Sequence, residues 1–530
     1  MKRFSLHVLV FISFSISIVP LVGQAGTLDP EFGQNGKASI SLGAYSTGTD
    51  LQVLPDGKIL LAGRWQPIGG GGFSNFLIRL NTDGTIDNTF GINGKADTYP
   101  QPANFINPYR IAVQPDGKIL ALLEAQSIPA DGTNRAVILR FEPNGTFDIS
   151  FGVAGKAFST PGWNVSPSSI LIAPDGKIVV GGTSENNGAG TNFAIMRFLP
   201  DGSKDTTFGG EGKIEADFDS SSERYESLNI QPDGKIVAAG LLYPEASLLM
   251  LRLNDDGSPD TTFGTNGKLF DPFKTWNQYA NAMKFLPDGK ILLSGATFAD
   301  QLGIHFCLFQ LNADGSVDET FGDKGLYVYY LGGDYEHLYN TCFQSDEKIL
   351  MGGTLGDPDY GFVLQRVNDD GTYDTGFGDA GVVRGTENSV FDGIFRCATV
   401  KLQPDDKIVA LGEYLIGAQN DGTIPVYRFN ADQNSGVAGV SPFVFPANVY
   451  PNPLIVNDVT IEYTLPVRSE VTILLHDING QQVQTLLPGS KRETGMQKEA
   501  LHLEPSLPSG IYFIELTAGE TSKTVRIVKN

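Results

Sequence analysis

The chain has 530 residues, with 63 Gly, 30 Pro and 41 % hydrophobic residues, a composition typical of a turn-rich folded protein. A chain of this length exceeds one ordinary core, so several domains or a repeat array are expected. The formal net charge of −22 argues against nucleic acid as a partner, because phosphate binding needs clustered Lys and Arg. The same charge disfavours long-range attraction to anionic membrane surfaces.

The N-terminal residues have the pattern of a secretory signal peptide. Lys2 and Arg3 precede the apolar run FSLHVLVFISFSISIV, and Pro20 and the small-residue stretch VGQA follow it. The run is short and interrupted by Ser, which disfavours a stable membrane span. We therefore expect residues 1–25 to be removed on export, leaving a mature chain without a transmembrane segment.

Two short motifs divide residues 27–432 into seven repeats, with intervals of 55 to 60 residues. The first motif is PDGK, which begins at residues 55, 115, 174, 232 and 287 and changes to SDEK at 345 and PDDK at 404. The second is D-x-x-F-G, which contains Phe32, Phe90, Phe151, Phe208, Phe263, Phe321 and Phe377. Two markers that keep one period establish a repeat architecture.

Within one period the pattern predicts four short strands. In the second full repeat they read GKADTY, YRIAVQ, KILALLEA and AVILRFE, with PDG as the turn before the third strand. Asp-Gly between apolar strands indicates a hairpin, because such turns need positive φ. Glu347 and Asp406 replace the turn glycine in two repeats. Glu tolerates the left-handed region less well than Asp, so we expect a more strained or more open turn at Glu347.

Four antiparallel strands repeated seven times, without a helical period, predict an all-β fold, a seven-bladed β-propeller. The mature sequence begins with the D-x-x-F-G motif and a first strand, GKASISL, and the array stops after a fourth-type strand, PVYRFN. We expect the first strand to complete the blade formed by residues near 390–430, which would leave no open edge. An open β-solenoid is the alternative.

The combination of PDGKI, R-[LF]-N-x-D-G and D-x-x-F-G resembles the delta-60 repeat family over about residues 27–430. The resemblance implies repeats of undefined ligand, often found on bacterial surface proteins. It supplies no catalytic or binding residues.

An Asp stands three residues before each repeated Phe, and an Arg recurs in the strand that precedes it. The Asp residues are Asp29, Asp87, Asp148, Asp205, Asp260, Asp318 and Asp374. The Arg residues are Arg79, Arg140, Arg197, Arg252, Arg366 and Arg428, with Gln310 in the same place in one repeat. We expect one structural Arg–Asp pair per blade. An anion-binding Arg ring in the channel is the alternative for the Arg residues.

Calcium is the alternative for the repeated Asp residues. Asn81, Asp83 and Asp87 offer spaced oxygen atoms, but the closing bidentate Glu of an EF-type loop is missing. Asp also stabilises turns by accepting hydrogen bonds from its own following backbone. We therefore expect no cofactor and treat a calcium site as the less favoured interpretation.

The irregular connections of the repeats are the predicted binding face. In an up-and-down meander alternate connections fall on one end of the sheet, so the two irregular connections of every repeat share a face. Variable loops on a rigid scaffold are where recognition usually occurs. The predicted ligand-binding residues are aromatic, as suits sugar rings or a partner protein: Trp65, Trp163, Tyr225, Trp276, Tyr279 and Tyr335. Packing of these rings under their own loops is the alternative.

No catalytic residue is predicted. His305 and His337 lack metal-ligand spacing, and no G-x-S-x-G elbow or phosphate-binding loop is present. A pair of loop carboxylates could still serve a polysaccharide hydrolase or lyase. The sequence therefore predicts a binding or adhesion protein, with an enzyme or a purely structural surface protein as alternatives.

Residues 433–448 have the composition of a linker, and residues 449–530 alternate polar and apolar residues as in a β-sandwich of about seven strands. This segment contains VYPNP, a D-x-x-G-x-x-V turn at Asp477, the sequence G-I-Y at Gly510 and the terminal K-x-x-R-I-V-K. In that order these features resemble the C-terminal sorting domain of the type IX secretion system of Bacteroidetes.

The sorting-domain resemblance implies two partners for this domain and a location for the mature protein. The translocon and a surface sortase would recognise residues 449–530, and the mature protein would be secreted or displayed on the outer cell surface. Release and attachment to lipopolysaccharide both stay open. An ordinary Ig-like adhesion module is the alternative for this domain.

Overall fold

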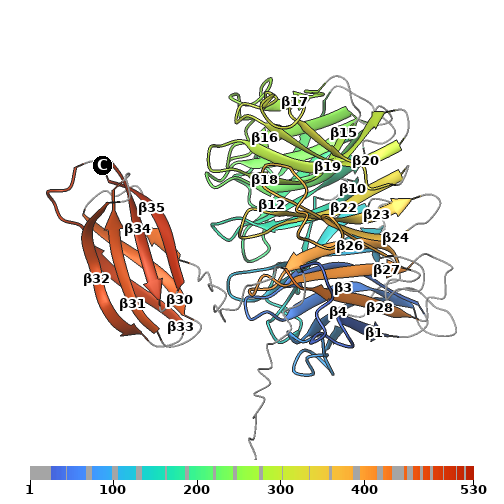
Figure 1. The fold of residues 1–530 in the computed structure, drawn as a ribbon, viewed down its shortest axis with the longest axis horizontal. Helices are drawn as coiled ribbons and strands as arrows, with labels where there is room; N and C mark the ends of the chain where they lie inside the picture. Colours follow the sequence, from blue (N-terminus) through green and yellow to red (C-terminus); the bar gives the residue numbers. More distant parts are fainter. Residues whose placement is uncertain are drawn as a thin grey trace, which may run out of the picture.

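The computed structural model is built of β-strands (Figure 1). It describes residues 25–529 apart from 43–44, 67–73, 98–104, 127–133, 161–163, 186–189, 219–221, 243–246, 274–277, 301–302, 333–334, 357–360, 386–393, 415–421, 432–446, 451–456, 466–468, 478–480, 493–494, 509 and 519–520. Across these described ranges, no helix is long and apolar enough to cross a membrane.

In the described part of residues 25–431, the strands form five four-stranded antiparallel sheets and one eight-stranded sheet that contains two further units of four strands. We number these seven four-stranded units as blades in chain order. Blade 1 comprises β2 (Tyr45–Val53), β3 (Ile59–Gln66), β4 (Ser74–Leu80) and β5 (Lys95–Asp97). Blade 2 comprises β6 (Phe105–Val113), β7 (Ile119–Gln126), β8 (Asn134–Phe141) and β9 (Lys156–Phe158). Blade 3 comprises β10 (Asn164–Ile172), β11 (Ile178–Glu185), β12 (Thr191–Phe198) and β13 (Lys213–Ala216).

The later blades repeat this order. Blade 4 comprises β14 (Glu223–Ile230), β15 (Ile236–Leu242), β16 (Ser247–Leu253) and β17 (Lys268–Phe270). Blade 5 comprises β18 (Gln278–Phe285), β19 (Ile291–Asp300), β20 (Gly303–Leu311) and β21 (Leu326–Tyr329). Blade 6 comprises β22 (Tyr335–Phe343), β23 (Ile349–Gly356), β24 (Gly361–Val367) and β25 (Val382–Arg384). A single parallel bridge between Ile304 and Tyr335 joins blades 5 and 6.

Blade 7 is built from both ends of the propeller. Its strands β26 (Ile394–Leu402), β27 (Ile408–Tyr414) and β28 (Thr423–Phe429) come from the last repeat, and β1 (Lys37–Ser41) is the first strand of the chain. β1 pairs antiparallel with β28, and the two labels lie together in Figure 1. The first strands of successive blades contact one another, and the cycle closes from β26 to β2. The prediction that the first strand completes the last blade is confirmed.

The hydrophobic core of the propeller lies between the blades. Among the described residues, seven apolar clusters each join two neighbouring blades. In one of them Leu122 and Ile138 of blade 2 pack with Ile170 and Ala194 of blade 3. Because a neighbouring blade covers each face, a strand such as β12 is buried over almost its whole length. This explains why the third strands read as continuous apolar runs and not as alternating patterns.

The turns that replace PDGK with a non-glycine residue keep the glycine conformation. Glu347 has φ 71° and Asp406 has φ 62°, both in the left-handed region. The turn hydrogen bond from Glu347 N to Gln344 O is 3.2 Å long, whereas the equivalent bond from Asp406 N to Gln403 O is 2.9 Å. The turn at Glu347 is therefore the more open of the two, as its side chain predicts.

The C-terminal domain is a sandwich of two sheets. One sheet has the order β29 (Ala447–Tyr450), β30 (Asp458–Leu465) and β33 (Gly495–His502). The other has the order β32 (Gln482–Arg492), β31 (Ser469–His476), β34 (Gly510–Ala518) and β35 (Thr521–Lys529). Ile461, Ile473 and Ile514 form part of the core between the sheets. The described residues of this domain thus contain seven strands, as the alternating pattern of the sequence predicts.

The predicted all-β propeller is confirmed, and so is the all-β sandwich at the C-terminus. Nearly all of the predicted signal peptide, residues 1–25, and most of the predicted linker, residues 433–448, lie outside the described residues.

Candidate binding site in the central channel

The repeated Arg and Asp residues form an ion pair in six of the seven blades. The Arg Nε to Asp Oδ2 distance is 2.7 to 2.8 Å in five blades, in the pairs Arg79–Asp87, Arg140–Asp148, Arg197–Asp205, Arg252–Asp260 and Arg366–Asp374. In blade 7 Arg428 Nη2 lies 2.8 Å from Asp29 Oδ2. These buried pairs lie at the uniform turns and not in the channel, so they do not form the anion-binding ring considered as the alternative.

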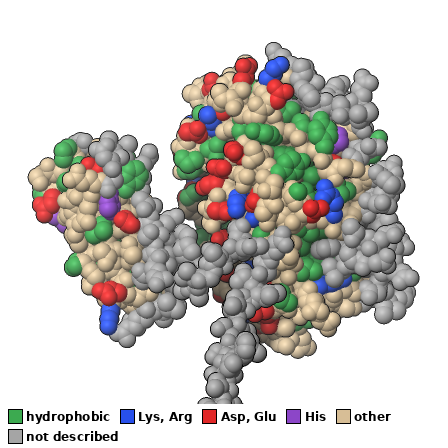
Figure 2. All heavy atoms as spheres, in the orientation of Figure 1, with side chains coloured by type: hydrophobic (Ala, Val, Ile, Leu, Met, Phe, Trp, Pro, Cys, Tyr) green, Lys and Arg blue, Asp and Glu red, His purple; other side chains and the backbone are tan. Residues whose placement is uncertain are grey.

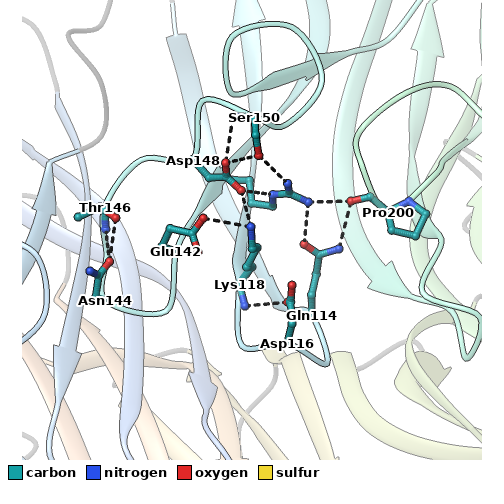
Figure 3. A network of polar contacts seen from close by, with 10 residues as sticks. Gln114, Asp116, Lys118, Glu142, Asn144, Thr146, Asp148, Ser150 and Pro200 are labelled. Carbon is teal, nitrogen blue, oxygen red and sulfur yellow. Dashed lines mark hydrogen bonds and ion pairs between the residues drawn. The ribbon is translucent and has the colours of Figure 1, made fainter.

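Blade 2 shows the surroundings of such a pair (Figure 3). Lys118 of the PDGK turn lies 2.8 Å from Asp148 and 3.0 Å from Glu142. Asp148 Oδ1 accepts hydrogen bonds from the backbone N and the hydroxyl of Ser150. Burial raises the pKa of Asp148, but the hydrogen bonds from Lys118 and Ser150 outweigh it and hold the pKa well below its usual range. The carboxylate is therefore charged and fully engaged by the scaffold.

The repeated Arg also ties each blade to the next one. Arg140 Nη1 donates to the carbonyl oxygen of Pro200 in blade 3 at 2.8 Å, and Arg79 Nη1 donates to Pro143 in blade 2 at 2.7 Å. The Arg140 guanidinium lies 4.6 Å from the ring centre of the repeated Phe151. One guanidinium therefore joins an Asp, a Phe and a neighbouring carbonyl, which gives the repeated residues a structural role.

Blade 5 lacks this arrangement because Gln310 stands in the place of Arg. Asp318 retains the PDGK lysine, with Lys290 Nζ at 2.8 Å. Phe321 is 9 % exposed, whereas the other six repeated Phe side chains are 0 % exposed. Without a guanidinium across its face, this ring is the least covered of the set.

The oxygen atoms proposed as calcium ligands are occupied by protein donors. Asp83 Oδ1 accepts hydrogen bonds from the backbone N and hydroxyl of Thr85, at 3.0 and 2.7 Å. Asp87 is held by Arg79, Lys58 and Thr89. Among the described residues, no group of three His, Cys, Asp or Glu side chains is arranged to hold a metal ion. The contacts support the structural interpretation of these Asp residues.

The aromatic residues predicted to bind ligand do not form one described cluster. Trp163, Trp276 and the side chain of Tyr279 lie outside the described residues. Trp65 is partly buried, with Lys95 Nζ 4.8 Å from its ring centre, and Tyr335 is 48 % exposed. Tyr225, by contrast, is only 3 % exposed and packs edge-on against Phe193, so the structure places it in the core and not on the expected exposed face.

The first strand of every blade carries a β-bulge that faces the central channel, the space enclosed by the seven first strands. The ladders skip a residue between Gly48 and Asp50 in blade 1 and at the corresponding point in blades 3 to 7, whereas in blade 2 the ladder is interrupted between Ile106 and Arg110. A bulge redirects the side chain of the extra residue. The bulged residues with described side chains are not repeated: Thr49, Ser168, Glu226, Asn281, Tyr339 and Ala398.

A hollow of about 300 Å³ opens at these bulges. Strands of blades 1, 2, 6 and 7 line it, and its residues are Thr47, Gly48, Thr49, Arg64, Arg110, Tyr339, Arg396, Ala398 and Glu413. Three of the lining residues are arginines and one is a glutamate. This volume lies at the lower end of the range for small-molecule sites.

Contacts among the lining residues hold the arginines in place. Arg110 Nη1 donates to the backbone oxygen of Thr49 at 3.0 Å. Arg396 binds Glu413 through Nε and Nη2, at 2.7 and 2.6 Å, and its guanidinium lies 4.4 Å from the ring centre of Tyr339. Burial lowers the pKa of Arg396, but the charge of Glu413 outweighs it and raises the pKa, so Arg396 is always charged.

The hollow is locally positive in an acidic protein. Three of its lining residues are Arg and one is Glu, and His337, whose ring centre is 6.4 Å from that of Tyr339, is neutral near pH 7 because burial lowers its pKa. Figure 2 shows acidic side chains spread over the visible propeller surface, with Lys and Arg in separate small groups. The concentration of guanidinium groups at the channel is therefore an exception to the net charge of −22.

Sequence reasoning missed Arg64, Arg110 and Arg396. The sequence did contain a signal. Each of the three is a charged residue within a strand, and the residue at the equivalent position differs from repeat to repeat. The residue in the place of Arg64 is Glu124 in blade 2, Thr183 in blade 3 and Glu413 in blade 7. Only the closure of the ring, however, brings the three arginines together.

A second hollow, of about 570 Å³, lies beside β21 in blade 5. Phe273, Tyr327 and Tyr330 line it together with Glu319 and Lys324. It lies at the outer strand of its blade, away from the channel.

Two family models match the chain. A beta-propeller domain of unknown function, DUF5122, matches residues 54–90, 114–151, 173–208, 231–263 and 286–321. A secretion system C-terminal sorting domain matches residues 448–530. No curated protein matches the chain.

Among solved structures, a protein of unknown function from Dyadobacter fermentans is 15 % identical, with a TM-score of 0.36 over 61 % of this chain and 94 % of the other. The β-propeller domain of the Trilobed protease from Pyrococcus furiosus is 12 % identical, with a TM-score of 0.40 over 75 % and 100 %. A polysaccharide lyase, an ulvan lyase, is 9 % identical, with a TM-score of 0.42 over 74 % and 96 %. These likenesses carry no argument about ligand or activity.

The two family matches and the strand topology agree on the organisation of the protein. Five of the seven copies of each repeated motif fall within the matched DUF5122 segments, and the C-terminal sandwich coincides with the matched sorting domain. The chain therefore carries the repeats of the DUF5122 beta-propeller family and ends in a type IX secretion sorting domain, which makes it a protein of the cell exterior, secreted or on the outer cell surface.

Proposed function

We propose that the protein is a non-catalytic binding or adhesion protein that holds an extracellular glycan or protein at the channel mouth. The observation that supports this proposal is that the repeated residues and the variable residues lie in different parts of the propeller. The repeated Asp, Arg, Lys and Phe side chains are engaged with one another at the uniform turns. The residues that differ between repeats line the hollow of about 300 Å³ on the first and second strands of four blades.

The variable connections begin where these strands end, so they would extend the site that the hollow starts. Trp163 and Trp276 belong to such connections. Aromatic rings beside charged and hydroxyl groups suit a sugar or a partner surface.

Filling the hollow tests the proposal. Ala398 lines the hollow and is partly buried, so Ala398→Trp would occupy the space that a ligand needs. Asn88→Trp places the same side chain at an exposed position of the opposite face and serves as the matched control. The exported chain is applied to a glycan array and to immobilised polysaccharides and surface proteins, and each variant is first checked by its melting temperature.

We expect the wild type and Asn88→Trp to capture the same ligand and folded Ala398→Trp to lose it. Trp163→Ala combined with Trp276→Ala is expected to weaken the same capture. Undiminished capture by folded Ala398→Trp would contradict the proposed site, and failure of the wild type to bind any of these ligands would contradict the proposed function.

A polysaccharide hydrolase or lyase is a second candidate, favoured by one observation. Glu226 is the bulged residue of β14, and burial raises the pKa of its carboxyl. Arg224 Nε lies 2.9 Å from Glu226 Oε1 and lowers this pKa, but burial outweighs it. A carboxyl whose pKa is raised keeps its proton to higher pH and can act as a general acid. Turnover of a polysaccharide that Glu226→Gln abolishes, without loss of binding, would favour the enzyme over the binding protein.

The same proposal includes the processing of the chain. Residues 1–25 would be removed as a signal peptide, the propeller would extend over residues 27–432, and residues 433–448 would link it to the sorting domain. The translocon and a surface sortase would be the partners of residues 449–530. The N-terminus and C-terminus of the exported protein, determined by mass spectrometry, test these boundaries.

A further inference from the structure

We infer that the ligand group bound in the hollow is a negatively charged sugar, one that carries a carboxylate or a sulfate ester. This inference rests on the proposed function and specifies its ligand class. It starts from three guanidinium groups, those of Arg64, Arg110 and Arg396, which line one hollow of about 300 Å³. Planar guanidinium groups match the paired oxygens of carboxylate and sulfate better than any other side chain does.

Among the residues that line the hollow, three are positively charged and one is negatively charged. Arg396 is paired with Glu413, whereas Arg110 donates a hydrogen bond to the neutral backbone carbonyl of Thr49. Asp50 is the nearest acidic neighbour in β2, but it does not line the hollow, and its oxygens accept hydrogen bonds from the backbone N of Leu51 and Ile111. An anion would therefore enter a site with more positive than negative groups.

The neutral lining favours a sugar over an acidic protein side chain. Thr47, Thr49 and Tyr339 line the same hollow, and the Arg396 guanidinium lies against the Tyr339 ring. The Thr47 and Thr49 hydroxyl groups donate to the carbonyl oxygens of Gly48 and Ala62, and their oxygens can still accept hydrogen bonds from a ligand. A sugar acid presents hydroxyl groups around its charge, so it can use both kinds of partner at once. An Asp or Glu of a partner protein would use the guanidinium groups and leave the hydroxyl groups of the hollow without ligand contacts.

The shape of the site also favours a chain or ring over a folded surface. The hollow is recessed among the first strands of four blades. The rest of the protein is acidic, with a net charge of −22, and would repel a broad acidic surface. A sugar unit can reach the guanidinium groups without such a broad contact.

The test compares acidic and neutral carbohydrates on the exported chain. The probes are polygalacturonate oligomers for carboxylate, dextran sulfate for sulfate, unmodified dextran as the neutral control and free glucuronate as the isolated anion. Binding is measured by isothermal titration calorimetry at fixed salt concentration. We expect one acidic polymer to bind at least tenfold more tightly than dextran. Tighter binding of polygalacturonate would identify a carboxylate, and tighter binding of dextran sulfate would identify a sulfate ester. Comparing the affinity of the polymer with that of free glucuronate distinguishes a polymer site from a small-anion site.

Variants assign the binding to the hollow. Arg64→Gln and Arg110→Gln should each weaken the acidic ligand about tenfold or more, because each removes a charged donor. Arg64→Lys keeps the charge and should restore part of the loss. Arg384→Gln is the matched control, since Arg384 is exposed on the outer strand β25 of blade 6 and does not line the hollow. Melting temperatures establish that every variant is folded.

Two results would overturn the inference. Equal binding of acidic and neutral polymers would show that the hollow does not select charge, and unchanged binding by both folded Gln variants would place the acidic ligand elsewhere. In either case, the chain could still capture a neutral glycan or a protein. If Ala398→Trp abolished that capture, the proposed binding function would stand. The failure of the inference is thus distinguishable from the failure of the proposed function.

Discussion

Arg428, at the end of the propeller sequence, forms an ion pair with Asp29, at its beginning: Arg428 Nη2 lies 2.8 Å from Asp29 Oδ2. Lys407 Nζ lies 2.6 Å from the same oxygen. Asp29 precedes β1. Arg428 lies in β28 and Lys407 in the turn before β27, and both strands belong to the blade that β1 completes. Arg428 Nη1 also donates to the carbonyl oxygen of Thr82 in blade 1. The Arg–Asp contact that five other blades make within their own repeat is made here between residues about 400 positions apart, and it closes the ring.

Asp29→Ala should therefore destabilise the whole propeller. The substitution leaves Arg428 and Lys407 without their carboxylate in a largely buried place, which costs about 3 kcal/mol of the free energy of unfolding. Urea denaturation monitored by fluorescence measures the change. Glu31→Ala is the control, because the Glu31 side chain is exposed and only its backbone N contacts Asp29. Equal midpoints for the two variants would show that the pair does not fasten the ring.

The repeated carboxylates predict a loss of stability in acid. Burial alone would raise the pKa values of Asp87, Asp148 and Asp260, but hydrogen bonds from Lys and Thr or Ser lower them well below the ordinary value of 3.8. A carboxyl whose pKa is lower in the folded state stabilises the fold above its unfolded pKa, and this stability is lost as pH falls through the folded pKa.

The melting temperature should accordingly be nearly constant from pH 7 to about 5 and fall steeply below about 4. Asp148→Asn should start from a lower melting temperature and show a shallower decline, since one titrating group is absent. A melting temperature that does not change between pH 7 and 3 would contradict the assignment of these carboxylates to the ion pairs.

Gln310→Arg should stabilise the protein by completing the set of repeated arginines. The new guanidinium would reach Asp318 and cover Phe321, the one repeated Phe that is partly exposed, and we expect a gain of about 1 kcal/mol. The reverse change, Arg252→Gln in blade 4, should cost about 2 kcal/mol, because Arg252 binds Asp260 and Ala313 and covers Phe263. Chemical denaturation of both variants checks the pair. A loss of stability in Gln310→Arg would show that blade 5 has adapted to Gln.

Glu347→Gly should also be stabilising. Glu347 has φ 71°, a conformation that costs a side-chain-bearing residue about 1 kcal/mol relative to Gly. Its contact with Lys284 lies at the surface and offsets little of this cost. The matched opposite change is Gly289→Glu in the preceding repeat, where φ is 86°, and it should lower the melting temperature. If the two substitutions shift the melting temperature in the same direction, backbone strain is not the cause.

The local sequence determines the blade and its turns. Asp-Gly at each PDGK motif requires a tight turn with positive φ, and two apolar strands flank it, so the strands and their order follow from residues close together in the chain. The Arg–Asp pairs follow as well, because the two residues are eight positions apart and meet across one connection. The sorting domain is equally local, since its motifs stand in one continuous segment.

The site depended on closure of the ring. Arg64, Arg110 and Arg396 belong to different blades, and their strands carry bulges that redirect single side chains. Nothing within one repeat indicates which bulged residues share a hollow, because that depends on how the blades are arranged around the axis. Burial of Tyr225 likewise depends on Phe193 of the neighbouring blade. The sequence by itself determined the repeat, its export and its scaffold, whereas only the tertiary structure decided which unrepeated side chains meet.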